Sequence, residues 1–153
     1  MIEGLERILY EHPFFADLEP EHTRLLAGCA RNHRFAAGQY LFREGEPADE
    51  FFIIRHGKVA LELVGPGRAP IVFETLMDGE IAGASWLVPP YRWMFDARAL
   101  ELTRAIGIDA ACLRGKCDAD HDLGYEMMKR FLWILVRRLD ATRLQILDVY
   151  GRG

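Results

Sequence analysis

The sequence predicts an α+β fold in which an antiparallel β-roll lies between N-terminal helices and a long C-terminal helix. Short apolar segments separated by Gly- and Pro-marked turns follow one another between residues 34 and 108, and this spacing is typical of an antiparallel roll or barrel. Apolar residues recur at helical spacing on both sides of that region. We therefore expect one domain over residues 1–153, with N-terminal helices at 1–33, the roll at 34–108 and C-terminal helices at 109–150.

Two short helices are predicted before the roll. Residues 4–12 place three apolar side chains on one helical face, and Pro13 ends that helix. A second helix starts near Pro20, which stands in the first turn, where its missing N–H is harmless. The roll then consists of predicted strands at 51–54, 59–64, 71–76, 95–102 and 103–108.

Residues 79–100, GEIAGASWLVPPYRWMFDARAL, form the segment around which the chain is organised. Gly79 and Gly83 allow backbone torsions that other residues avoid, and residues 84–87 have room for one helical turn before Pro89. Free N–H groups at the start of such a turn form an anion-binding concavity. A plain connection between two strands is the alternative interpretation of this segment.

The longest helical pattern covers residues 123–150. Its apolar positions recur at steps of four and three, the spacing of a coiled-coil seam that a second copy can cover. We therefore expect a homodimer; the alternative is that the whole stripe packs on its own domain. The seam consists of Met128, Leu132, Leu135, Leu139, Thr142, Ile146 and Val149. A second face, suited to packing on the roll, consists of Met127, Phe131, Ile134 and Arg138.

The composition is that of a globular chain, with 50% apolar residues and a net charge of −4. A DNA-binding surface is not expected, because phosphate neutralisation needs clustered Lys and Arg. No apolar run is long enough to span a membrane and the N-terminus lacks a signal-peptide core, so we expect a cytoplasmic protein. Cys29, Cys112 and Cys117 form neither a CxxC nor a zinc pattern, and we expect reduced thiols.

Several motifs, in order, resemble the cyclic-nucleotide-binding domains of the Crp/Fnr class. They are FAAGQYLFREGEPAD at 35–49, FIIRHGKV at 52–59, GEIAG at 79–83 and ARAL at 97–100. The resemblance covers nearly the whole chain. It implies a jelly-roll-like β-roll with a phosphate-binding cassette between two strands, and a C-terminal helix that dimerises and reports ligand occupancy.

The cassette departs from the family pattern at two positions. Ala84 stands where the family usually has a Glu that binds the ribose hydroxyl, and Trp93 stands where it has the phosphate-binding Arg. Losing both anchors lowers affinity on the order of a hundredfold or more. Arg92 is one residue out of register, so it reaches the pocket only from a loop or a bulge. Ser85 can hydrogen-bond a phosphate, as a serine does in the family.

Aromatic residues replace the missing polar groups: Trp86, Tyr91, Trp93 and Phe95. These rings either fill the roll as core residues or cap an altered cavity for a purine or a more apolar ligand. The predicted ligand-binding residues are Gly83, Ala84, Ser85, Trp86, Arg92 and Trp93. No cofactor is certain, and cyclic AMP or cyclic GMP is the possible ligand.

An enzyme is the competing class of function. A β-roll also resembles metal-binding cupins, but the histidines are scattered over helices and turns and no metal site is predicted: His12, His22, His33, His56 and His121. Ser85 is the only serine and lacks a nucleophile motif. We expect no catalytic residues.

The resemblance implies a non-enzymatic sensor. Family transcription factors continue into a helix-turn-helix module, whereas only three residues follow Tyr150, so we expect a stand-alone module that contacts a protein partner. A ligand in the cassette would shift how the helices after Asp109 pack on the roll. The alternatives are a degenerate scaffold that binds no small molecule and a genuine cyclic-nucleotide binder that uses Arg92.

Overall fold

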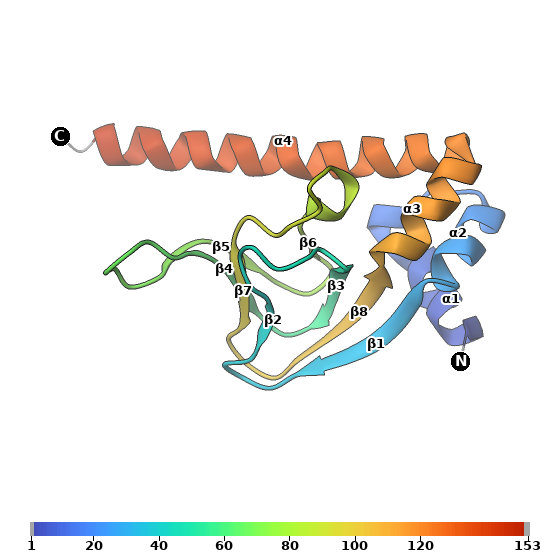
Figure 1. Ribbon diagram of the computed structural model, residues 1–153, viewed down its shortest axis with the longest axis horizontal. Coiled ribbons are helices and arrows are strands. Elements are labelled where there is room, and N and C mark those ends of the chain that lie inside the picture. Colours follow the sequence, from blue (N-terminus) through green and yellow to red (C-terminus); the bar gives the residue numbers. More distant parts are fainter. Residues whose placement is uncertain (1, 152–153) are drawn as a thin grey trace.

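The computed structural model describes residues 2–151 of the chain (Figure 1). Met1, Arg152 and Gly153, which the domain prediction included, lie outside the described residues. The chain begins with helix α1 (Ile2–Glu11), a short 3-10 helix η1 (Pro13–Phe15) and helix α2 (Pro20–Ala27), which starts with Pro20 as expected.

The roll consists of two four-stranded antiparallel sheets, which confirms the predicted fold class. One sheet has the order β1-β8-β3-β6 and the other β2-β7-β4-β5. The strands are β1 (Ala30–Phe35), β2 (Tyr40–Phe42), β3 (Glu50–His56), β4 (Val59–Leu63), β5 (Ile71–Leu76), β6 (Ile81–Ala82), β7 (Asp96–Ala99) and β8 (Thr103–Asp109). The roll therefore starts at Ala30, earlier than the expected 34, because β1 pairs with β8 from that residue onward.

Two helices follow the roll, α3 (Ala110–Ala119) and α4 (His121–Gly151). The Asp109 side chain accepts a hydrogen bond from the Cys112 N–H and caps α3. Asp120 separates the helices and its carboxylate accepts from the N–H of Leu123 in the first turn of α4. Figure 1 shows α4 lying across the roll and extending beyond it.

Helix α4 uses the two faces that its sequence pattern distinguishes. Met127 and Phe131 are buried on the body, and the Arg138 guanidinium forms an ion pair with Glu74 of β5. The seam face is exposed to solvent: Leu132 is 61% exposed and Leu139 is 50% exposed. The seam therefore does not pack on its own roll.

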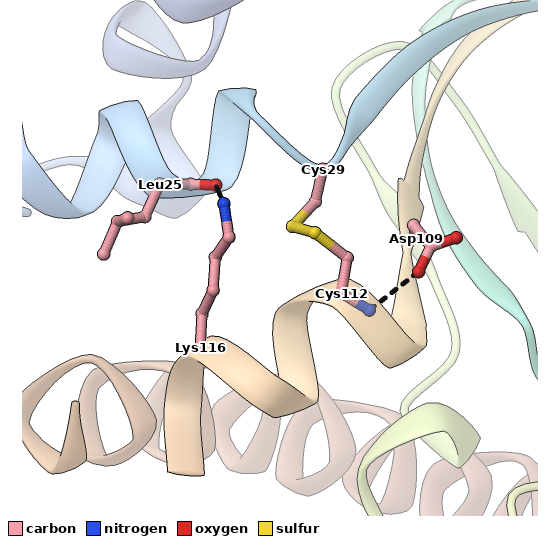
Figure 2. Close-up of a disulfide and its surroundings, with 5 residues drawn as sticks. All are labelled: Leu25, Cys29, Asp109, Cys112 and Lys116. Atoms are coloured by element: carbon pink, nitrogen blue, oxygen red, sulfur yellow. Dashed lines mark hydrogen bonds between the residues drawn. A yellow bond between two sulfur atoms is a disulfide. The ribbon is translucent and has the colours of Figure 1, made fainter. Parts of the chain in front are cut away.

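The prediction of three reduced thiols is wrong, because Cys29 and Cys112 form a disulfide (Figure 2). Their Cα atoms lie 5.8 Å apart. The start of β1 meets the start of α3, where the Asp109 N–H donates to the Cys29 carbonyl at 2.8 Å. A separation of 83 residues hides this proximity from spacing rules. Cys117 is free, and burial followed by the charges of Asp118 and Asp120 raises its pKa to about 11.

Among the described residues, no helix combines the length and the apolar character needed to cross a membrane.

Candidate functional site: the 79–100 cassette

The cassette begins with two glycines in left-handed backbone conformation. Gly79 has φ +86° and Gly83 has φ +78°, on either side of strand β6, which pairs with β3. Residues 84–87 form the expected helical turn as the 3-10 helix η2 (Ser85–Leu87). Both Ala84 and Ser85 are half-buried at its start.

The Trp93 ring fills the space beside Gly83. Trp93 is 2% exposed, and its ring stacks on Phe42 of β2 with centroids 3.6 Å apart. A Cβ atom on Gly83 would lie only 2.1 Å from Trp93 Cζ3. The indole thus occupies the space next to Gly83.

Arg92 lies on the other side of the chain from Trp93. Its side chain is exposed, and Nη1 donates to the Gly45 carbonyl at 2.8 Å. Backbone hydrogen bonds hold this segment to the 45–48 loop, including Trp93 N–H to the Glu46 carbonyl at 3.0 Å. The bond to Gly45 engages one of the five guanidinium N–H groups.

Trp86 connects the cassette to α4. It is fully buried, and its ring centroid lies 4.9 Å from that of Phe51 in β3 and 5.2 Å from that of Phe131 in α4. Arg114 of α3 donates to the Trp86 carbonyl at 2.7 Å and its guanidinium covers the Tyr91 ring at 4.1 Å. Both helices after the roll therefore contact the cassette directly.

Trp86 also carries a buried donor without an acceptor. Its Nε1 has no hydrogen-bond partner within the described part of the chain. A buried, unpaired donor costs about 1–3 kcal/mol. The ring therefore stays in this place because of its packing on Phe51 and Phe131.

Arg98, near the end of the cassette in β7, forms an ion pair with Glu62 of β4. Arg98 donates to both carboxylate oxygens of Glu62, at 2.8 and 3.1 Å, across the β4–β7 pairing. Hydrogen bonding and the charge of Glu62 raise the pKa of Arg98. Sequence reasoning missed this pair and also missed Arg114, since the partners lie far apart in the chain.

A hollow of the molecule lies at the start of the cassette, where Gly79, Glu80 and Ile81 line it. A groove of about 950 Å³ runs between η1, the β5–β6 turn and α4, and neither Gly83 nor Trp93 lines it. Two of its arginines are paired, Arg130 with Glu126 and Arg138 with Glu74. Within residues 2–151, no group of three or more His, Cys, Asp and Glu side chains could hold a metal ion.

Comparison with known proteins places this geometry in a family. The cyclic nucleotide-binding domain family matches residues 32–120, which contain the roll except its first two residues, the cassette and α3. The chain belongs to the cyclic nucleotide-binding domain family. This confirms the resemblance described above.

Two relatives of this domain are regulators. The chain is 26% identical over 145 residues to a CRP-like cAMP-activated global transcriptional regulator of Mycobacterium tuberculosis, with 95% of this chain and 63% of the regulator covered. It thus spans less than two thirds of that protein. A 60-residue match, 30% identical, covers 39% of this chain and 15% of a cAMP-dependent protein kinase regulatory subunit of Emericella nidulans.

Solved structures of the family have the same fold. A cyclic nucleotide-binding protein from Geobacter metallireducens superposes with a TM-score of 0.78 at 27% identity, over 89% of this chain and 98% of that one. A cyclic nucleotide-binding domain from Methylobacillus flagellatus has a TM-score of 0.78 at 20% identity, over 96% of this chain and 83% of that one.

Proposed function

We propose that this chain is a non-enzymatic regulatory domain that dimerises through α4 and in which the state of the cassette is transmitted to that helix. The observation that carries the proposal is the contact of Trp86 with Phe131. A shift of η2 would move a buried ring against α4, and packed interiors respond to such displacements by switching between discrete arrangements. Arg114 provides a second link, from α3 to the Trp86 carbonyl.

The ligand specificity of the cassette is modified in this proposal. Trp93 supplies an apolar ring in place of the phosphate-binding Arg, and Ala84 supplies no carboxylate for a ribose. The family's ligand, a cyclic nucleotide, therefore binds weakly or not at all, and a scaffold that responds to a protein partner or to a more apolar ligand fits the site better. Ser85, half-buried at the start of η2, is the residue that an occupant of the cassette would meet first, whereas Gly83 and Trp86 are buried.

The dimer is the first part to test. Replacing Leu135 and Leu139 with Glu places charges in the seam, where burial without partners is costly. We expect the mass in solution, measured by light scattering at tens of micromolar chain, to fall from twice 17.5 kDa to 17.5 kDa. The weakening expected is on the order of a hundredfold or more, equivalent to about 3 kcal/mol.

Leu144→Glu is the matched control. Leu144 lies nine residues after Leu135, so at about 100° per residue it stands on the opposite side of α4. It is 66% exposed, and the same charge there should leave the dimer intact. A wild-type monomer, or a dimer that survives both seam charges, would contradict the proposal.

A further inference from the structure

The Cys29–Cys112 disulfide is the first of three bonds made by α3 and the residue that follows it. Cys112 and Lys116 are four residues apart and share a face of α3, and Asp120 directly follows the helix. Lys116 Nζ donates to the Leu25 carbonyl at 3.0 Å, as Figure 2 shows. The Asp120 carboxylate lies 3.2 Å from His22 Nε2. All three bonds join α3 or Asp120 to α2 or to the residue pair that follows α2.

The disulfide is the only covalent one of these three bonds. It closes a loop that contains the whole roll, because β1 begins beside Cys29 and β8 ends just before α3. When it is open, the polar contacts of Lys116 and Asp120, the buried side chains of Ala110 and Leu113 and the Arg114 bond to Trp86 remain. Helix α3 would then have lost its covalent attachment to Cys29.

The two cysteine residues differ in their exposure to solvent. Cys29 is 6% exposed, whereas Cys112 is half-buried in the first turn of α3. An incoming thiolate therefore meets Cys112 first. Cys117 does not compete, since it is mostly protonated near neutral pH.

A change in the attachment of α3 to α2 would reach both the cassette and α4, because α3 contacts both. It carries Arg114, which contacts the cassette, and it ends at Asp120, which caps α4. Disulfides in proteins exposed to intracellular thiols are usually transient and redox-sensing.

We propose that Cys29 and Cys112 form a redox switch that attaches α3 to α2 when oxidised and releases it when reduced. A dithiol reductant supplies the two electrons. One of its thiolates attacks Cys112 Sγ and Cys29 leaves as a thiolate; the second thiolate then displaces Cys112, and the dithiol becomes a cyclic disulfide. The two cysteines take up protons from solvent. This switch goes beyond the proposed function, because it acts on α3 without any occupant in the cassette.

Hydrogen exchange of the full chain, followed by mass spectrometry with and without dithiothreitol, tests the switch. We expect amides of residues 110–119 to exchange at least tenfold faster after reduction, while β3 and β8 keep their protection. Oxidised glutathione should restore slow exchange. The Cys29→Ser/Cys112→Ser variant should exchange like the reduced protein and ignore the reductant, and Cys117→Ser should behave like the wild type.

Three results would overturn the proposal. The first is three titratable thiols in the denatured, aerobically purified chain, because the disulfide would then not form. The second is exchange in α3 that does not respond to reduction. The third is an equal loss of protection in β3 and β8, which would make the bond a staple of the whole fold. None of these readouts depends on the dimer or on the cassette, so failure of the proposed function would be seen separately.

Discussion

Trp86→Ala is expected to lower the free energy of unfolding by about 3–5 kcal/mol, the range for deleting a buried aromatic side chain. The ring is fully buried and packs against Phe51 on one side and Phe131 on another. Its removal leaves a cavity where η2, β3 and α4 meet. Urea denaturation followed by circular dichroism measures the change.

Trp86→Phe is the matched control for that substitution. It keeps an aromatic ring between the same neighbours and removes the Nε1–H that lacks an acceptor in the described structure. The lost volume lowers the free energy of unfolding, and the removal of the unpaired donor raises it. We therefore expect that free energy to change by no more than about 1.5 kcal/mol. A cost for Trp86→Ala below about 1 kcal/mol would show that the ring is not packed against α4.

Gly83→Ala is expected to destabilise the protein by about 2–4 kcal/mol, since it adds steric overlap to a strained backbone. Gly83 has φ +78°, and its new Cβ would lie 2.1 Å from Trp93 Cζ3. Gly79→Ala separates the cost of backbone strain from the cost of steric overlap with Trp93. Gly79 has a similar φ of +86° but its Cβ would meet only His12 Nε2, at 3.8 Å, so about 1–2 kcal/mol is expected there.

Trp93→Leu completes a double-mutant cycle with Gly83→Ala. Leucine keeps apolar bulk near the backbone but has no atom at the position of the indole Cζ3. In this background Gly83→Ala should cost about 1–2 kcal/mol, like Gly79→Ala, which leaves a coupling energy of about 1–2 kcal/mol between residues 83 and 93. Strictly additive costs in urea denaturation would mean that the Trp93 ring does not lie against Gly83.

The fold could be predicted because its signals are local. Turn residues separate short strands, and the two faces of α4 follow from helical periodicity: Phe131 is buried on the body while Leu132, one residue on, is exposed. Counting back from Arg98 predicts Trp93 in the arginine register, and this stays a prediction. The helix α3 was expected only as part of a helical region after 109, since Gly115, Lys116 and Asp118 weaken its apolar pattern.

The missed features all join distant parts of the chain. Cys29 and Cys112 are 83 residues apart, and no spacing rule for isolated cysteines brings them together. Trp86 and Phe131 meet only because α4 folds back over η2 (Figure 1). The side chain of Arg92 was left open by sequence reasoning, because the choice between loop and strand at that residue depends on the 45–48 loop that pairs with it.

Isothermal titration with cyclic AMP and cyclic GMP, run on the wild type beside Arg92→Ala, tests most directly the claim that Trp93 has changed the cassette. We predict no binding by either protein up to millimolar ligand, since the indole occupies the space beside Gly83 and Arg92 is bonded to Gly45. Micromolar binding by the wild type would contradict the account. If Arg92→Ala abolished that binding, Arg92 would be the phosphate ligand; if it did not, the ring would have to move aside to admit the nucleotide.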